Sequence, residues 1–194
     1  MHSRIAILGL ALAALVAAAA VPSAAEPTSS LPPMALGASD PVERVQYGPG
    51  SGSWVDAGGG SVPPGAFPGG QEGPPNYETL FVCRTMYNGS MQLGKVRPGL
   101  GGCYFAYSGS EVSMPSYQVL MGGYYHWVRW NGGIPGRAVQ GGYDAPPQSM
   151  PLFVCQAPYG NGMHPGKTRP DWDSCDISWG GREVFVHGFA VLVQ

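Results

Sequence analysis

The residues best suited to chemistry occur twice in this sequence, at one fixed spacing. Lys95 and Lys167 lie 72 positions apart, and so do Glu111 and Glu183. An ammonium group donates hydrogen bonds and a carboxylate accepts them, so an acid and a lysine side by side can bind the hydroxyls of a polar ligand. A single lysine in a Gly-rich turn is more simply a surface side chain. Its recurrence in an equivalent place favours a function, because duplicated positions without one are free to diverge.

The sequence argues against two other kinds of site, a phosphate-binding loop and a metal site. Residues 89–96 imitate a phosphate-binding loop, but Val96 stands where a Ser or Thr would hold magnesium, and Asn161 replaces the first glycine in the second copy. No helical pattern follows either segment. Three histidines remain after the first 25 residues, and they neither recur nor have the spacing of metal ligands: His126, His164 and His187. We expect them to be separate surface or packing residues, and we expect no metal ion and no cofactor.

A catalytic role has little support. Glycosidases need two carboxyl groups about 5–10 Å apart across the scissile bond. The first copy offers Glu72 with Glu111 as candidates, and the second offers Asp144 with Glu183. Nothing else in the sequence favours this chemistry, so we expect no enzyme and a structural role for the two recurring glutamates.

These residues belong to an internal duplication that covers most of the chain. Residues 62–120 align with residues 134–192 without a gap, and 22 of the 59 aligned positions are identical. A duplication of this length predicts two copies of one structural unit whose apolar faces cover each other. We assign the first copy to residues 54–123 and the second to residues 124–194.

Short β-strands are the elements expected to position these residues. The chain is rich in Gly (31) and Pro (20), 11% of its residues are aromatic, and no segment has a sustained helical period. Apolar or alternating runs between turn residues predict strands, together with their equivalents in the second copy, at residues 80–84, 103–107, 111–112 and 117–120. Such closely spaced strands are typical of sandwiches and barrels, so the predicted fold class is all-β.

The first 25 residues have the features of a signal peptide. Arg4 precedes an apolar core at residues 5–20, and residues 23–25 are the small residues of a cleavage site. The core is shorter than the ~20 residues of a membrane-spanning helix, and no later stretch is long enough. We therefore expect no membrane span and a secreted or periplasmic mature protein. Residues 26–53 are rich in Pro, Ser and Gly, which predicts a linker.

The four cysteines are consistent with an oxidising compartment. They occupy matching positions in the two copies: Cys83 with Cys155, and Cys103 with Cys175. Four cysteines allow three pairings, and both pairing within each copy and crossed pairing would respect the duplication. A zinc site is the alternative, but no two cysteines have the Cys-x-x-Cys spacing. We expect structural disulfides.

The order of the motifs resembles the DM9 repeat. Each copy has Trp-Val, a Gly-rich turn, Val/Ile-Pro, a Gly-Gly pair followed by an acid, Leu-Phe-Val-Cys, Gly-Lys-x-x-Pro, Gly-x-Glu and a closing Val-Leu. The resemblance covers residues 54–192, which is nearly all of the expected folded part. It implies one compact β-sandwich or barrel-like domain in which two DM9 repeats pack about a pseudo-twofold axis.

The resemblance also implies a function. DM9 proteins include secreted or surface lectins for mannose-type sugars, and the repeat also occurs beside the pore-forming domain of natterin-like proteins, for which this chain leaves no room. In the lectins, an acid after the Gly-Gly turn and the lysine of the Gly-Lys loop contact the sugar. These residues correspond to Glu72 and Lys95 in the first copy and to Asp144 and Lys167 in the second. The first copy departs further from the pattern, because it has Glu for Asp and Leu93 where the loop usually has Pro.

The expected partners are mannose-type glycans or a cell-surface polysaccharide. We expect millimolar affinity at one site, about −4 kcal/mol, with avidity from two sites on one rigid body. Tyr87 and Tyr159 recur and are candidates to stack on a sugar ring, whereas we expect the five tryptophans in the core or between the copies. A net charge of −2 provides no basic surface for nucleic acid. The sequence is compatible with a homodimer. The alternative function is that of an envelope or surface protein that binds another protein and no sugar.

Overall fold

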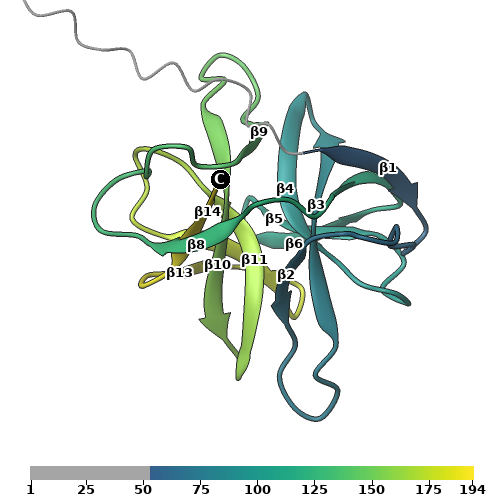
Figure 1. Ribbon diagram of the computed structural model, residues 1–194. Coiled ribbons are helices and arrows are strands. Elements are labelled where there is room, and N and C mark those ends of the chain that lie inside the picture. The colour runs from purple at the N-terminus through teal and green to yellow at the C-terminus, as the bar shows by residue number, and fades with distance from the viewer. Residues whose placement is uncertain (1–52) are drawn as a thin grey trace, which may run out of the picture. The chain divides into compact units, whose positions relative to one another are not determined.

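The computed structural model describes residues 53–194. All regular elements in this range are β-strands, which confirms the predicted all-β class (Figure 1). The strands of the first repeat are β1 (Trp54–Gly58), β2 (Pro68–Gln71), β3 (Thr79–Tyr87), β4 (Ser90–Val96), β5 (Cys103–Tyr107), β6 (Ser110–Met114) and β7 (Ser116–Leu120). The strands of the second repeat are β8 (His126–Arg129), β9 (Gln140–Tyr143), β10 (Pro151–Tyr159), β11 (Gly162–Thr168), β12 (Cys175–Trp179), β13 (Arg182–Val186) and β14 (Ala190–Val193).

Eight of these strands form a closed barrel. Their order is β3-β2-β11-β12-β13-β6-β5-β4, and the pairing of β3 with β4 closes the ring. Strands β7 and β1 extend the sheet beyond β3, while β9, β10, β14 and β8 extend it beyond β4. Because the barrel takes strands from both repeats, neither repeat completes it alone.

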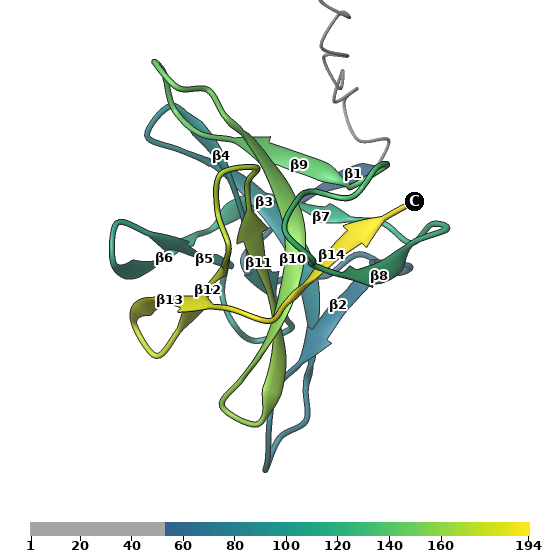
Figure 2. The same cartoon turned by 90° about the vertical axis from the view of Figure 1, so that its left-hand side faces the viewer.

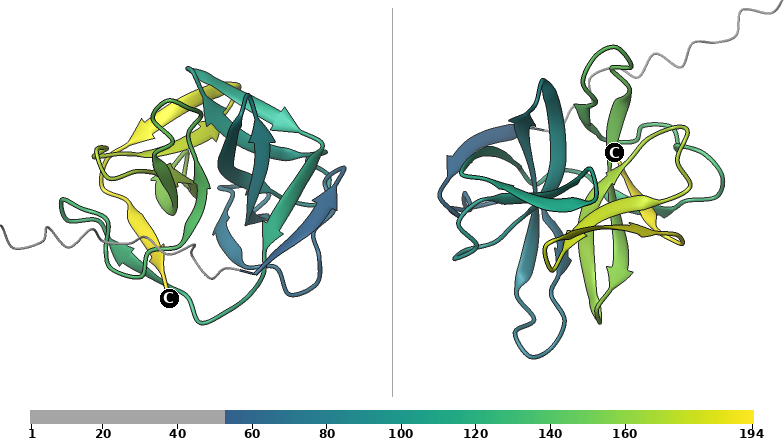
Figure 3. Two further views of the ribbon diagram at one scale, coloured as in Figure 1. Left: turned by 90° about the horizontal axis from the view of Figure 1, so that it is seen from above. Right: turned by 180° about the vertical axis from the view of Figure 1, so that it is seen from behind.

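The two repeats pair their strands across a pseudo-twofold axis. Strand β2 pairs with β11 through Gln71 and Met163, and the equivalent residues of the opposite repeats, 72 positions away, form the bridge between β9 and β4. Ser110 of β6 pairs with Arg182 of β13, and these two residues are each other's equivalents, so this bridge lies on the axis. The hairpins β5–β6 and β12–β13 lie side by side there (Figures 2 and 3).

The structure has two equivalent pairs of strands beyond the predicted ones. The Gly-Gly segments, expected as turns, form β2 and β9, and the Gly-Lys segments, expected as loops, form β4 and β11. Strand β4 is buried on both faces, so its sequence lacks the apolar and polar alternation of a half-exposed strand. The lysines consequently lie in interior strands, which corrects their expected position in exposed loops.

Strands β4 and β11 each have three neighbours, because the sheet divides along them. One end of β4 pairs with β9, and the end that carries Lys95 pairs with β5. At the division, a Cβ atom on Gly94 would lie 2.0 Å from the carbonyl oxygen of Tyr104, and one on Gly166 would lie 2.3 Å from that of Asp176. Only glycine allows the backbones to approach so closely.

The core confirms that the repeats cover each other. One apolar cluster combines Leu93 and Leu120 of the first repeat with Leu152 and Leu192 of the second. Each repeat also has a cluster of its own around a disulfide. The bridges are Cys83–Cys103 and Cys155–Cys175, so the pairing lies within each repeat and joins β3 to β5 and β10 to β12.

The predicted signal peptide and residues 26–52 of the predicted linker lie outside the described residues. Between residues 53 and 194, no helix is long and apolar enough to cross a bilayer.

Candidate functional site

A pocket of about 450 Å³, here called the lysine pocket, opens where the two repeats meet. It contains Asp144, from the turn after β9, and Lys167, from β11, so the structure brings these two predicted site residues to one cavity. The first repeat contributes Tyr107 at the end of β5. The other lining residues are Ser108, Ala145, Pro146, Gln148, Arg169, Trp172, Asp176, Glu183 and Phe185.

Lys167 reaches across the axis into the first repeat. Its ammonium group donates a hydrogen bond to Oε1 of Gln92 at 2.5 Å and another to the carbonyl oxygen of Ala106. The residue is only 3% exposed. Burial lowers the pKa of Lys167, and the nearby carboxylates of Glu183 and Asp176 oppose that shift. The lysine is therefore a fixed internal donor and not a mobile surface side chain.

Asp144 is held by an arginine. Its Oδ2 accepts a hydrogen bond from Nη1 of Arg169 at 2.6 Å, and Arg169 also pairs with Asp171, at 2.7 Å. The guanidinium group lies over the ring of Trp172, 4.5 Å from its centroid. Arg169 thus orients the predicted acid and one aromatic ring of the pocket.

Two further carboxyl groups lie behind this pair. Asp176 is buried and accepts a hydrogen bond from the hydroxyl of Ser174 at 2.9 Å. Burial raises the pKa of Asp176 to about 6, partly opposed by the Ser174 bond. Glu183 accepts a hydrogen bond from the backbone N–H of Gly109 at 2.6 Å, so it caps the β5–β6 turn of the other repeat.

The equivalent residues of the first repeat have the same arrangement with different partners. Lys95 donates to the carbonyl oxygen of Ser178 at 2.5 Å and to Nδ1 of His164 at 3.5 Å, and it lies 3.8 Å from Oε1 of Glu111. Nε2 of His164 in turn donates to a carbonyl oxygen at 3.1 Å, so the neutral imidazole satisfies both contacts. Burial, together with the charge of Lys95, lowers the pKa of His164 to about 4.

Glu72 has the same kind of partner as Asp144. Nε of Arg97 donates to its Oε1 at 3.1 Å, and Arg97 also pairs with Glu78 at 3.1 Å. Arg97 therefore holds Glu72 as Arg169 holds Asp144.

Comparison with known proteins identifies the family. The model of the DM9 repeat matches residues 42–114 and 74–186. This chain belongs to the DM9 repeat family. The two matches overlap at residues 74–114, so they do not test the predicted boundary at residue 123.

A solved structure supports the same fold. The chain is similar to the nematode sperm cell motility protein MFP2B, with a TM-score of 0.56 and 17% identity over 73% of this chain. It spans 46% of the length of that protein. No curated protein matches this chain.

The two DM9 sites differ at many equivalent positions, four of which are compared next. Around Lys167 stand Gln92, Asp176, Trp172 and Tyr107. The residues at the same places around Lys95 are His164, Tyr104, Leu100 and Trp179. The duplication has therefore preserved the lysine, the arginine and the glutamate of each DM9 repeat and changed the groups that surround them.

The predicted stacking tyrosines do not line the lysine pocket. Tyr87 packs edge-on against Tyr107, with ring centroids 5.1 Å apart, and Tyr159 packs in the same way against Trp179 at 5.4 Å. Tyr107 and Trp172 line the pocket instead. The sequence signal for these two was weak, because neither is identical in the other DM9 repeat, and Trp172 was expected in the core or between the copies.

Proposed function

We propose that this protein is a secreted carbohydrate-binding protein for mannose-type sugars, and that the lysine pocket of the second DM9 repeat is its principal site. The observation that carries the proposal is the shared cavity of Asp144 and Lys167, which three aromatic side chains also line: Tyr107, Trp172 and Phe185. The two buried disulfides are consistent with an extracellular or periplasmic location.

The hydrogen-bond inventory of the pocket suits a sugar. A lysine has three N–H donors, and Lys167 uses two of them, on Gln92 and Ala106. The third has no acceptor within residues 53–194, so it is available to a hydroxyl oxygen. Oδ2 of Asp144 is engaged by Arg169, which leaves Oδ1 to accept from a hydroxyl. One donor and one acceptor, both held rigidly, match a pair of vicinal hydroxyls.

The first repeat is less suited to the same task. Lys95 has three neighbours that take up its donors: Ser178, His164 and Glu111. No N–H of Lys95 is left for a ligand unless one of these contacts breaks. We therefore assign the first site a lower affinity for sugar than the second.

Catalysis fits the pocket poorly. Asp144 is ion-paired with Arg169, and Glu183 accepts a backbone hydrogen bond from Gly109. A glycosidase needs one carboxylic acid to give up a proton and another to attack or activate water. Each of these two carboxylates already accepts a hydrogen bond from the protein on one oxygen, which favours a role in binding over one in proton transfer.

The test is a matched pair of variants titrated with methyl α-mannoside. D144N keeps the shape of the side chain but removes its charge, and E72Q makes the equivalent change in the first repeat. We expect D144N to weaken binding by about tenfold or more, because a charge-assisted hydrogen bond is lost. E72Q should leave the affinity nearly unchanged. Equal binding by D144N and the unmodified protein would refute the assignment.

A second candidate function is a protein-interaction module. The similarity in fold to the nematode sperm cell motility protein MFP2B favours it. Capture of one discrete protein partner, unaffected by excess methyl α-mannoside and by D144N, would support this alternative.

A further inference from the structure

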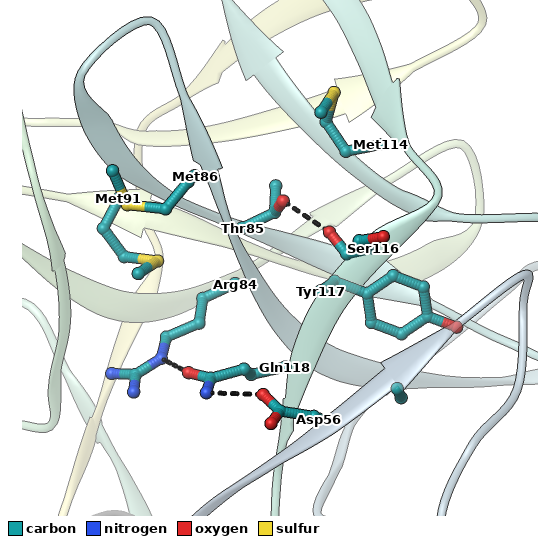
Figure 4. A pocket seen from close by; sticks show the side chains of 10 residues that line it. Asp56, Arg84, Thr85, Met86, Met91, Met114, Ser116, Tyr117 and Gln118 are labelled. Atoms are coloured by element: carbon teal, nitrogen blue, oxygen red, sulfur yellow. Dashed lines mark hydrogen bonds between the residues drawn. The ribbon is translucent and has the colours of Figure 1, made fainter.

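A second cavity lies away from the lysine pocket, within the first repeat. Its volume is about 600 Å³, and it lies among β1, β3, β4, β6 and β7. Met86 and Met91 stand on one side of Thr85, and Met114 stands on the other (Figure 4). We call it the methionine groove. Its size and its apolar walls are those of a small-molecule site.

A polar chain of three side chains forms the floor of the methionine groove. Nε of Arg84 donates to Oε1 of Gln118 at 2.8 Å, and Nε2 of Gln118 donates to Oδ1 of Asp56 at 2.8 Å (Figure 4). Arg84 also donates to the carbonyl oxygen of Gly141 and lies over the ring of Trp54, 4.3 Å from its centroid. The guanidinium group is therefore held in place by neutral acceptors and an aromatic face.

Arg84 lacks the ion pairs that the other interior arginines have. Arg97 and Arg169 each pair with two carboxylates. Between residues 53 and 194, no carboxylate lies within ion-pairing distance of Arg84, and the amide of Gln118 separates it from Asp56. Burial lowers the pKa of Arg84, although the charge of Asp56 opposes the shift. A half-buried cation without a counter-ion, next to an apolar cavity, is complementary to an anionic ligand with an apolar body.

The groove recurs in the second repeat with a different composition. A cavity of about 300 Å³ has Gln156, Pro158 and Met163 at the positions of Arg84, Met86 and Met91. Its arginine is Arg129, at the end of β8, so the charge has moved to another strand. The duplicated fold therefore creates this cavity in both repeats, while the large, methionine-lined form with an interior cation occurs in the first.

We propose that the methionine groove binds a small amphiphilic carboxylate, such as a medium-chain fatty acid anion. The carboxylate would pair with Arg84, and the alkyl chain would lie between Met86 and Met91 on one side and Met114 on the other. Methionine side chains are flexible and polarizable, so they adapt to a chain of variable shape. This site is separate from the lysine pocket, and the proposal does not depend on sugar binding.

Titration of the full chain, labelled with ¹³C at the methionine methyl groups, tests the proposal. Decanoate should shift the signals of Met86, Met91 and Met114 in a saturable manner and leave those of Met121 and Met150 unchanged. Decanol, which has the same chain without the charge, should bind about tenfold more weakly, since it cannot form the charge-assisted contact. Equal affinity for decanoate and decanol, or the absence of saturable shifts, would overturn the proposal.

Two substitutions, each introducing the residue found at the equivalent position of the second repeat, distinguish the contribution of the Arg84 charge from that of the apolar wall. R84Q introduces the residue found at Gln156, and it should reduce the affinity for decanoate about tenfold while leaving that for decanol unchanged. M114V introduces the residue found at Val186, and it should weaken both ligands alike. Retention of full decanoate affinity in R84Q would contradict the role of the cation. Neither variant touches Asp144 or Lys167, so binding of methyl α-mannoside should persist in both.

Discussion

At the scale of single residues, the two DM9 repeats keep the same lysine but surround it with different titratable groups. Asp176 lies near Lys167, and His164 contacts Lys95. Burial shifts both pKa values away from those of the exposed groups, to about 6 for Asp176 and to about 4 for His164. The two shifts make stability depend on pH in opposite directions. Asp176 is an acid that resists losing its proton, so it lowers stability as the pH rises, whereas His164 is a base that resists gaining one, so it lowers stability as the pH falls.

The first prediction concerns Asp176. Its pKa is raised on folding from 3.8 to about 6, so the folded state binds the extra proton and its stability falls as the pH rises between about 4 and 6. We expect D176N to be more stable than the unmodified protein at pH 7.5 by about 2 kcal/mol, and the difference to shrink towards pH 4. Urea denaturation of both proteins at pH 7.5 and at pH 4 measures this difference in the free energy of unfolding. D173N changes an exposed acid and should alter stability by less than about 0.5 kcal/mol at either pH. A D176N effect independent of pH would contradict the assignment.

The second prediction concerns His164. Its pKa is lowered on folding from 6.5 to about 4, so its contribution to stability is present above pH 6.5 and is lost as the pH falls towards 4. H164Q introduces the residue that the first repeat has at Gln92. We expect H164Q to match the unmodified protein within about 1 kcal/mol at pH 7.5 and to exceed it by about 2 kcal/mol at pH 4.5. Thermal unfolding at the two pH values decides the matter, and equal acid sensitivity of both proteins would be the contrary result.

At the scale of elements, the division of the sheet along β4 and β11 determines where the lysines point. Each of these strands pairs with a strand of its own repeat on one edge and with strands of both repeats on the other. The glycine before each lysine lets the neighbouring strand approach, so the lysine side chain enters the space between the repeats. The Gly-Lys dipeptide is thus a structural unit as well as part of the candidate site.

The third prediction tests this division. G94A and G166A would each place a methyl group within 2.0–2.3 Å of a carbonyl oxygen, at Tyr104 and at Asp176 respectively. Backbone cannot move aside as a flexible side chain does, so we expect each variant to lose about 2–4 kcal/mol of stability. G133A is the matched control, because a Cβ atom there meets nothing within 4 Å. Chemical denaturation of the three variants gives the comparison, and a loss in G94A no larger than in G133A would disprove the steric argument.

At the scale of the molecule, the duplication produces one folding unit from two repeats. The pairings of β2 with β11, β4 with β9 and β6 with β13 all join one repeat to the other. The central apolar cluster also draws on both repeats. The candidate sugar site depends on this pairing between repeats, since Lys167 is held by Gln92 and Ala106 of the other repeat.

The fourth prediction is that one repeat cannot fold as a monomer. A chain that stops at residue 123 leaves β4 without β9 and β2 without β11, and it exposes half of the central cluster. We expect residues 26–123 to be unfolded or to form a dimer that restores the missing pairings. Size-exclusion chromatography with light scattering, together with an amide NMR spectrum, distinguishes these states. A well-dispersed spectrum from a monomer would show that strand pairing between the two repeats is not required for folding.

Much of this architecture could be read from residue patterns. The 72-residue offset revealed the two repeats, and short apolar runs located the strands around Cys83, Cys103 and their equivalents. The same patterns failed at β4 and β11, because a strand buried on both faces has no alternation to detect. They also failed at Tyr107 and Trp172, which recurrence between repeats could not reveal since both positions differ in the other copy.

The sequence by itself determined the all-β class, the duplication and the matched cysteines. Only the tertiary structure decided that the lysines are buried across the axis, that Arg169 orients Asp144, and that Arg84 faces a methionine-lined groove with no counter-ion among residues 53–194. The physical reason is that residue patterns report the faces of one strand at a time. Which strands become neighbours, and hence which side chains share a cavity, depends on pairings between residues far apart in the chain.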